Sequence, residues 1–446
     1  MNTARSAIRV SALASIVATA ALTVTETPCQ VTQSWATIVD DGARFEMGRY
    51  LALDPAGNAI VGSASPGPPG GPGFRLTKID PAGTVIWSQR FASAAPGGGL
   101  SIVGLAVDGA GDILSVCREG DPNGNRALTV KVSGDGKELW RAVYDTDGAD
   151  WPVGIEVDAA GRSFVGGWTQ RFEPTQALEN AFILSYDADG NLLWQDQYGS
   201  GKNQETINDI ARDPVSGAVY LAGDLNGSVP LLLRYEADGR RRWARRYQSH
   251  AVQAYAERVA VGPDGVVLAG FYAGRGVGIQ VIKVDAASGR SLWSAVYGEA
   301  TTYEQLIDVA IDGSGNVLVA GAAETEPPIV RFLGLFLLRY APDGTLSWTV
   351  TDDRIGAFHG ALAVDPSGSP YVTGTRQVRV DNFFTQHWLT SRYDTTGQLV
   401  WTIEYDGNPG GLTGGISQDL ALTSAGDVIV IGDVTGDVHA VSYREP

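Results

Sequence analysis

The chain has 446 residues, of which 44% are hydrophobic, and it carries a formal net charge of -17 at pH 7. Such an acidic protein repels phosphate backbones and anionic lipids, which argues against nucleic acid as a partner. The 57 glycines and 21 prolines are spread over many short turns. The composition therefore predicts a chain that is folded along nearly its whole length.

The N-terminus has the pattern of a bacterial secretory signal peptide. Arg5 and Arg9 precede a run of small and apolar residues at 11–24, and Ala18-Thr19-Ala20 offers a cleavage site. We expect residues 1–24 to be the signal peptide and residues 25–33 a lead-in, with the mature protein periplasmic, secreted or at the cell surface. A retained anchor is the weaker alternative because the run is short for a bilayer, and no later stretch predicts a transmembrane segment.

The two cysteines, Cys29 and Cys117, are too few for a disulfide framework. Cys29 follows Glu26-Thr27-Pro28, which lacks the small residues of a lipobox, so lipidation at Cys29 has little support. A bridge between Cys29 and Cys117 is left open.

A segment that ends in Trp recurs about every 50 residues, which indicates a repeat architecture. In the clearest copy, Lys283-Val284-Asp285 ends an apolar strand, Gly289 completes a turn, and the next strand carries Trp293. The other copies carry Trp87, Trp140, Trp194, Trp243, Trp348 and Trp401. An aromatic residue usually follows the Trp on the same face of the strand, so we expect these pairs to pack between neighbouring sheets.

Earlier in each repeat, an apolar strand ends in Asp and a Gly follows shortly after. The Asp side chain accepts hydrogen bonds from turn amides and the Gly takes a positive φ, so each copy predicts a tight hairpin. Eight copies can be counted, which are Asp54 to Gly57, Asp108 to Gly111, Asp158 to Gly161, Asp213 to Gly217, Asp264-Gly265, Asp312 to Gly315, Asp365 to Gly368 and the degenerate Thr423 to Gly426.

Each repeat therefore holds four strands, which we call a, b, c and d in chain order. An isolated d-type strand at residues 34–39 comes first, and the last repeat has a, b and c at 418–423, 427–432 and 438–443 but no d. Pairing of the first strand with the last would complete an eighth sheet and leave no open edge. The sequence predicts an all-β fold, an eight-bladed β-propeller of four-stranded antiparallel blades over residues 34–446, closed by one N-terminal and three C-terminal strands.

These repeats resemble the secreted β-propeller repeats of bacteria, whose units read W-x-x-x-Y-G and then V-D-x-x-G-N-x-Y-V-x-G. Tyr297-Gly298 and residues 311–321 match that pattern most completely. Residues 285–293 are also similar to the tryptophan-docking motif of eight-bladed pyrroloquinoline-quinone proteins and their cofactor-free relatives. The resemblance covers residues 34–446 and implies the same fold and blade number, with mixed functional roles.

Strand alternation puts the a-to-b and c-to-d turns on one face of the ring and the longer, irregular b-to-c and d-to-a connections on the other. The b-to-c connections include residues 119–125, 169–180 and 376–384. We expect a ligand on the second face, at the mouth of the channel. There Glu46, Asp150, Glu205 and Glu304 precede strand a at equivalent positions, with Glu257 close to that register. Two interpretations stay open: a site for Ca²⁺ or a basic ligand, or side chains that cap amides of their own loops.

Aromatic residues on the same face are candidates to stack on sugars or peptide side chains, with packing inside their own loops as the alternative. They are Trp151, Trp168, Phe172, Tyr272, Phe358, Phe383 and Phe384. The four histidines, His250, His359, His387 and His439, lack metal-ligand spacing and are interpreted as exposed loop residues.

We therefore expect a monomeric binding or interaction module for a protein or glycan ligand, with no catalytic residues and no cofactor. One alternative is a hydrolase or lyase that uses the rim carboxylates. The other is a quinone-dependent dehydrogenase, which the tryptophan-docking resemblance implies. It would need Ca²⁺ and a catalytic carboxylate, and the sequence has neither an adjacent cysteine pair nor a clear ligand set.

Overall fold

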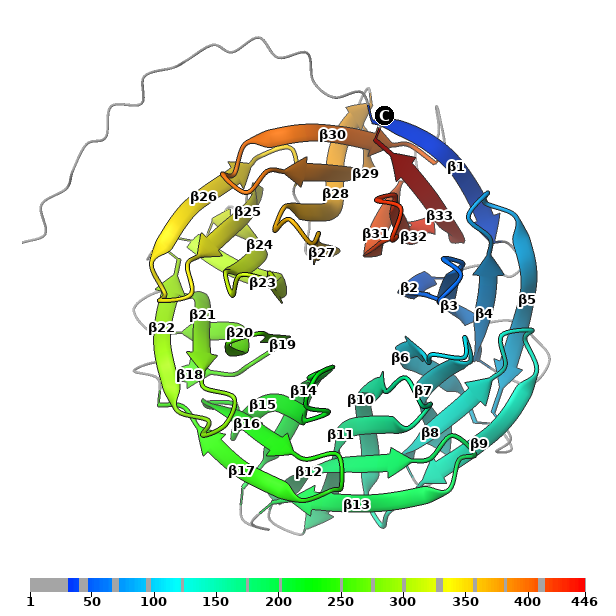
Figure 1. The fold of residues 1–446 in the computed structure, drawn as a ribbon, viewed down its shortest axis with the longest axis vertical. Coiled ribbons are helices and arrows are strands. Elements are labelled where there is room, and N and C mark those ends of the chain that lie inside the picture. Colours follow the sequence, from blue (N-terminus) through cyan, green and yellow to red (C-terminus); the bar gives the residue numbers. More distant parts are fainter. Residues whose placement is uncertain are drawn as a thin grey trace, which may run out of the picture.

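The computed structural model describes residues 31–39, 47–65, 72–93, 98–121, 124–173, 176–199, 203–248, 252–273, 277–298, 302–325, 332–355, 359–380, 383–407 and 414–445. Within these ranges the chain forms eight antiparallel sheets arranged around a central axis (Figure 1). The predicted eight-bladed β-propeller is confirmed. The predictions for residues 1–24 and for Cys29 concern positions outside the described residues. Within the described part, no helix is long and apolar enough to cross a membrane.

The first four blades follow the chain, each with its first strand nearest the axis. Blade 1 is β2 (Met47–Leu53), β3 (Ala59–Ser65), β4 (Gly73–Ile79) and β5 (Val85–Ala92). Blade 2 is β6 (Leu100–Val107), β7 (Ile113–Asp121), β8 (Gly124–Val132) and β9 (Glu138–Tyr144). Blade 3 is β10 (Ala149–Val157), β11 (Ser163–Glu173), β12 (Gln176–Tyr186) and β13 (Leu192–Tyr198). Blade 4 is β14 (Glu205–Arg212), β15 (Val219–Leu225), β16 (Val229–Tyr235) and β17 (Arg241–Arg246).

The remaining blades keep the same order, except that the innermost strand of blade 5 is split in two. Blade 5 is β18 (Gln253–Ala254), β19 (Arg258–Gly262), β20 (Gly265–Ala273), β21 (Val277–Val284) and β22 (Ser291–Tyr297). Blade 6 is β23 (Thr302–Ile311), β24 (Val317–Thr325), β25 (Phe332–Tyr340) and β26 (Leu346–Asp352). Blade 7 is β27 (Gly360–Val364), β28 (Pro370–Val380), β29 (Phe383–Tyr393) and β30 (Leu399–Tyr405). Blade 8 joins β31 (Gly415–Leu422), β32 (Val428–Val434) and β33 (Asp437–Arg444) to β1 (Thr32–Val39).

The ring closes in blade 8 as the sequence predicts. Strand β1 pairs antiparallel with β33, and Trp35 lies opposite Ser442. The two ends of the propeller are thus held in one sheet, which removes the open edges that a linear array would expose.

Apolar side chains of adjacent blades form shared cores between the sheets. One such core combines Ile60 and Leu76 of blade 1 with Ile113 and Val130 of blade 2, and it also contains Cys117. Each fully buried side chain of this size contributes about 1.5–3 kcal/mol, so the interblade layers supply most of the stabilisation. The Cys117 thiol is free and buried, and burial raises the pKa of that thiol.

The docking tryptophans join each blade to the next. The Trp87 indole N–H donates to the Gly134 carbonyl at 3.1 Å, in the c-to-d turn of the following blade. Trp35, Trp140, Trp194, Trp243, Trp293 and Trp348 donate to backbone carbonyls in the same way. Trp401 donates instead to a carboxylate oxygen of Glu445 at 2.5 Å.

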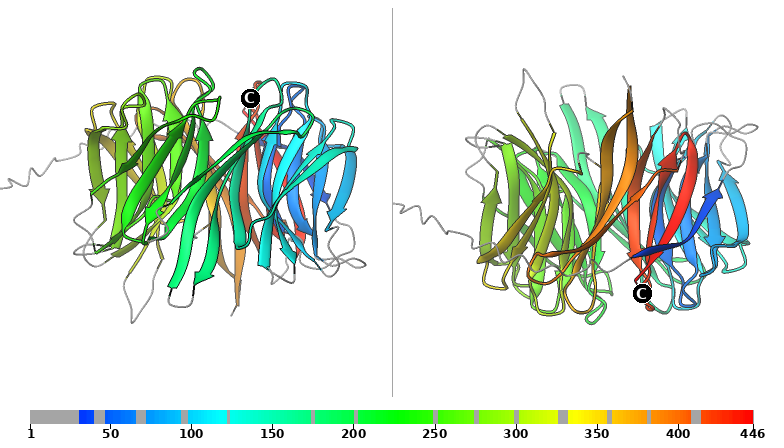
Figure 2. Two further views of the ribbon diagram at one scale, coloured as in Figure 1. Left: turned by 90° about the horizontal axis from the view of Figure 1, so that it is seen from below. Right: turned by 90° about the horizontal axis from the view of Figure 1, so that it is seen from above.

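The two faces of the disc are built differently (Figure 2). The turn face carries the a-to-b and c-to-d turns, and Asp54 is representative, since it accepts hydrogen bonds from the amides of Ala56 and Asn58 at 2.9 Å. Gly57 follows with φ of 81°. The predicted hairpins are confirmed.

The opposite face, the hairpin face, differs from the prediction. The connections expected to be irregular at 119–125, 169–180 and 376–384 are ladders that continue almost to their tips. Pairing extends to Asp121 and Gly124, to Glu173 and Gln176, and to Val380 and Phe383. The sequence analysis missed this because polar and charged residues in these segments conceal their strand periodicity.

Candidate functional site

Three of the acidic residues predicted at the channel rim are buried near the start of the innermost strands of their blades. Asp150 and Glu205 are 0% exposed and Glu304 is 4% exposed. Asp150 accepts hydrogen bonds from the amide and hydroxyl of Thr146, both at 2.9 Å, and from the Thr169 hydroxyl at 2.6 Å. Burial raises the pKa of Asp150 despite these bonds. This geometry favours the loop-capping interpretation for Asp150.

The other predicted acids have separate surroundings. Glu205 lies 3.9 Å from the Arg246 guanidinium, and Glu304 accepts a hydrogen bond from the Thr302 hydroxyl. Glu46 lies outside the described residues. No group of three or more His, Cys, Asp or Glu side chains that could hold a metal ion occurs within the described ranges. The cation site at the rim stays a prediction.

Among the predicted aromatic residues, the structure brings Trp151 and Trp168 together. They face each other across β10 and β11, and their rings stack at 5.3 Å with an interplanar angle of 10°. The Arg118 guanidinium of blade 2 lies 4.6 Å from the Trp151 ring centroid. A π-face is thereby used for contact between blades, which supports the packing alternative for Trp151.

The remaining candidate aromatics are distributed over three blades. Tyr272 is half-buried on β20. Phe172 lies in β11, and Phe383 and Phe384 lie in β29, whereas Phe358 is outside the described residues. Phe172, Phe383 and Phe384 therefore lie on paired strands, whereas the sequence analysis expected them in irregular loops.

A cavity of about 220 Å³ lies between blades 5 and 6, near the hairpin face. Its lining residues are Glu257, Phe271, Tyr303, Glu304, Gln305 and Leu306. Two of the predicted acids thus meet at one cavity, together with aromatic residues that the sequence analysis did not select. Burial is the main cause that raises the pKa of Glu257.

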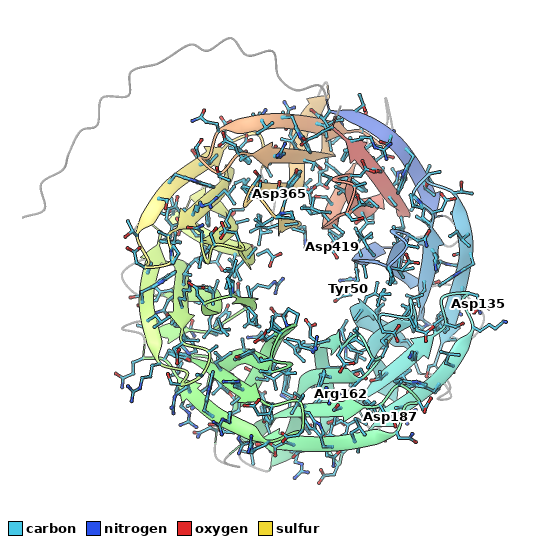
Figure 3. The ribbon with its side chains drawn as sticks, in the orientation of Figure 1. Tyr50, Asp135, Arg162, Asp187, Asp365 and Asp419 are labelled. Atoms are coloured by element: carbon cyan, nitrogen blue, oxygen red, sulfur yellow. The ribbon has the colours of Figure 1, made fainter. Side chains whose placement is uncertain are left out.

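Three carboxylates, which we call the axial carboxylates, lie on innermost strands, and the sequence analysis missed them. Asp209, Asp308 and Asp419 follow β-bulges at the same register of blades 4, 6 and 8. Tyr50 occupies that register in blade 1, and it points toward the axis with Asp419 (Figure 3). A charged residue inside an apolar inner strand, as in Ile307-Asp308-Val309, was the signal that could have revealed them.

These axial carboxylates connect neighbouring blades. Asp209 accepts from the amide of Val259 at 2.9 Å, in the next blade, and Asp419 accepts from the Leu51 amide at 2.8 Å. Burial raises the pKa of Asp209 to about 6 and that of Asp419 to about 7. The axial register therefore combines structural hydrogen bonds with unusually basic carboxylates.

Two further charged residues, Arg258 and Glu156, interact with the axial carboxylates. Arg258 of blade 5 approaches Asp308 at 4.0 Å, and their side chains are 47% and 31% exposed although both lie on innermost strands. Solvent thus reaches these groups along the axis. Burial and Asp209 raise the pKa of Glu156 on β10 to about 8.

Two histidines contradict the prediction that all four are exposed loop residues. His439 is 3% exposed on β33, where its Nδ1 lies 2.8 Å from the Tyr405 hydroxyl and burial lowers its pKa to about 4. His387 lies on β29 with Nδ1 2.5 Å from Glu404. Both belong to the sheet ladder, which a search for metal-ligand spacing does not detect. His359 is exposed, as predicted, and His250 lies outside the described residues.

The turn face carries a hollow of about 330 Å³ over blades 1 to 3, lined in part by Asp54, Asp108 and Asp158. These carboxylates are already engaged, since Asp54 also pairs with Lys78 at 2.8 Å and Asp108 with Lys131 at 3.0 Å. The hollow is therefore a consequence of the turns that stabilise the blades.

The eight blades and their docking tryptophans define a β-propeller of the pyrroloquinoline-quinone-like class. The family model described as "Outer membrane protein assembly factor BamB" matches residues 73–314, which is more than half of the chain. The protein belongs to this family. Its quinoprotein-like resemblance is confirmed, whereas assignment to the secreted repeats stays a prediction.

Solved structures share the fold at low sequence identity. The quinohemoprotein alcohol dehydrogenase of Comamonas testosteroni is 11% identical with a TM-score of 0.59, over 94% of this chain and 78% of that one. The quinohemoprotein alcohol dehydrogenase ADHIIG of Pseudomonas putida HK5 is 12% identical with a TM-score of 0.54, over 93% and 76%. These similarities show the fold alone. No curated protein matches the sequence.

The residues that the structure describes do not fit the quinone cofactor and Ca²⁺ that the dehydrogenase alternative would require. The two cysteines are not adjacent. In the described parts of the chain, Asp, Glu, His and Cys side chains form no cluster of three or more that could coordinate a metal. The axial carboxylates instead accept hydrogen bonds from backbone amides.

Proposed function

We propose that this propeller is an exported, non-catalytic binding module that holds a protein or glycan at its hairpin face. The observation that carries the proposal is the unequal length of the central hairpins. Strands β11, β12, β28 and β29 have 11 residues each, whereas β3, β4, β15 and β16 have 7.

The difference of four residues adds about 13 Å to a hairpin at about 3.3 Å per residue. The β28–β29 hairpin, in orange, extends beyond the neighbouring blades (Figure 2). Closing the ring does not need this length, because blade 4 completes its sheet without it. Projecting, paired backbone on one face of a rigid ring suits recognition of a partner, since little ordering entropy is lost on binding.

The proposed export depends on the signal peptide expected at residues 1–24, and an acidic surface fits a soluble exported protein. A monomer is proposed because ring closure leaves no strand edge at the ends of the array.

The test shortens the β11–β12 hairpin by removing residues 171–178 and joining Gln170 to Glu179 through Asn-Gly. Gln170 already pairs with Glu179, and their side chains are hydrogen bonded at 2.9 Å, so the shortened hairpin keeps its register. The measurement compares both proteins on a glycan array and in cross-linking to proteins of the exported fraction.

We expect the shortened protein to lose at least tenfold in affinity for a ligand that the parent binds. A matched control, Val215→Ser, changes an exposed residue of the turn face and should bind like the parent. A ligand that both variants bind as the parent does, or that only the turn-face variant loses, would contradict the proposal.

A propeller hydrolase or lyase is the second candidate. Its acid and base residues would be the axial carboxylate Asp419 and Glu156, which suit that role better than the rim carboxylates do. Asp419 and Glu156 have pKa values of about 7 and about 8, the range useful for a general acid or base near neutral pH. Release of products from a polysaccharide or peptide library would support it, provided that Glu156→Gln or Asp419→Asn abolishes the release. Activity that survives both substitutions would exclude these residues.

A further inference from the structure

The cavity between blades 5 and 6 has the shape and charge of a site for an organic cation. We propose that it binds the cationic side chain of a lysine or arginine presented by a partner protein. This inference rests on the proposed function, because it names the chemistry by which the hairpin face would hold a partner.

A break in the innermost strand of blade 5 builds the cavity. Strands β18 and β19 both pair with β20, with Ala254 opposite Tyr272 and Arg258 opposite Ala269. The three residues 255–257 therefore face only Gly270 and Phe271, so the link bulges away from the ladder. Gly270 permits this approach, since a Cβ there would lie 2.1 Å from the Tyr255 carbonyl oxygen.

The bulge gathers aromatic rings. Tyr255 stacks on Phe271 with a centroid distance of 5.0 Å and an interplanar angle of 13°. The ring of Tyr303, from blade 6, lies 6.4 Å from Phe271 at 53°. Rings held at an angle present a negative π-face together with a ring edge, and a cation is attracted to such a face within about 6 Å.

Two carboxyl-bearing residues complete the lining. Glu257 comes from the bulge and Glu304 from β23, and none of the six lining residues carries a positive charge. Arg258 is next in sequence and does not line the cavity. Its Nη1 donates to the Glu257 carbonyl at 3.1 Å, its charge offsets part of the effect of burial on the pKa of Glu257, and its Nε lies 4.0 Å from Asp308. Negative side chains and π-faces around one pocket favour a cation and disfavour nucleotides and other anions.

Size narrows the class of ligand. The cavity volume of about 220 Å³ is below the roughly 300–1,000 Å³ of pockets for drug-sized molecules. It suits one long cationic side chain, whose methylene groups would lie on Phe271 while its charged end meets the carboxylates. The net charge of -17 would also attract a basic partner and speed the encounter.

The test measures binding of a tetralysine amide to the full chain by calorimetry at 0.15 M salt, where exposed charges beyond about 8 Å are screened. Glu257→Gln removes a lining charge without changing size, and Phe271→Leu removes the central ring. Glu179→Gln is the control, because Glu179 also lies near the hairpin face and has its pKa raised by burial, but it does not line the cavity.

We expect each cavity variant to bind the tetralysine amide about tenfold more weakly, the control to bind within twofold of the parent, and tetramethylammonium chloride to compete. Phe271→Leu also perturbs packing. If that variant does not fold, the result for Glu257→Gln alone tests the proposal. Equal weakening by Glu179→Gln would reveal general attraction to an acidic protein and would overturn the proposal. Unchanged affinity in Glu257→Gln, or binding of tetramethylammonium but not of the peptide, would also overturn it.

The two failures can be told apart. If the tetralysine measurements overturn the cation site while the protein with the shortened β11–β12 hairpin still loses its ligand, only the cation site is wrong. If the shortened hairpin keeps every ligand while Glu257→Gln loses the peptide, the cation site stands and the wider use of the hairpin face is wrong.

Discussion

The turn face and the hairpin face belong to the same blades, but only the first repeats the same contacts around the ring. On the turn face, Asp108, Asp158 and Asp312 each accept from two amides of their own turn at 2.9–3.0 Å. On the hairpin face, the central strands vary from 7 to 11 residues. Contacts that recur in every blade stabilise the ring, and features that occur in one or two blades are the candidates for recognition.

The largest effect should come from breaking a turn-face ion pair. The Asp312 and Arg339 side chains are 2% and 10% exposed and lie 2.7 Å apart. Asp312→Ala leaves the guanidinium buried without this partner and should lower the free energy of unfolding by about 3–5 kcal/mol, measured by urea denaturation. Asp343→Ala, in the exposed c-to-d turn of the same blade, should have little effect. Equal losses would show that the buried ion pair contributes no more than an exposed turn carboxylate.

A smaller effect is expected where a docking tryptophan meets the next blade. Gly344 has φ of 88°, and a Cβ there would lie 2.7 Å from the Trp293 ring. Gly344→Ala should therefore cost about 1–2 kcal/mol for the backbone and more for displacing the ring.

Gly426 isolates the backbone contribution. It has the same φ of 88°, and a Cβ added there would meet no neighbouring atom within 4 Å. Gly426→Ala should lose only the backbone part in thermal denaturation. If the two variants lose the same stability, Trp293 does not dock tightly on blade 6.

The axial channel joins the two faces, and a carboxyl group beside it makes the stability of the protein depend on pH in a definite direction. Glu156 has a pKa of about 8 in the folded protein, above the value near 4.3 of an unfolded chain. Between these values the folded state holds the extra proton, so stability falls as pH rises. The melting temperature of Glu156→Gln should therefore exceed that of the parent by a margin that grows from pH 5 to pH 9.

Glu138→Gln provides the opposite control on the outer strand β9. Arg141 lowers the pKa of Glu138, so its ionised form stabilises the protein above the unfolded pKa, and this contribution is lost as pH falls. Glu138→Gln should thus be slightly less stable than the parent at pH 7, and the difference should vanish in acid. A margin for Glu156→Gln that is constant with pH would show that this carboxyl is fully solvated.

The smallest change in stability is expected from the hairpin face itself. Shortening the β11–β12 hairpin leaves the interblade cores intact, so the free energy of unfolding should change by no more than about 0.5 kcal/mol. Urea denaturation checks this value. A loss of several kcal/mol would mean that the long hairpins stabilise the ring and would weaken the distinction between the faces.

The sequence predicts the features that recur in each repeat. Asp-to-Gly turns and Trp strands predicted the number of blades, and the missing last d strand predicted that the N-terminal strand pairs with the last c strand. The structure sets the register of that pair, with Trp35 opposite Ser442. These features are local, so a pattern of spacing is sufficient to find them. The same pattern also placed Asp150, Glu205 and Glu304 at one register.

What the sequence could not supply are the contacts between blades that do not recur in every repeat. Glu257 and Glu304 meet at a cavity only because blade 5 has a bulge before β19. Asp209 and Asp419 follow bulges in their strands and accept hydrogen bonds from amides of the next blade. The burial of His439 depends on packing beside Tyr405 of blade 7, which no spacing of residues within one repeat reveals.

The most direct test of the distinction between the faces is hydrogen exchange of the full chain with and without a lysine-rich ligand. We predict added protection at residues 253–257, 269–273 and 302–306, around the cavity, with no change at the amides of Gly57, Gly111 and Gly161 on the turn face. Protection that concentrates on those turn amides, or on the innermost strands β14 and β31, would contradict it and would assign recognition to the turn face or the axis.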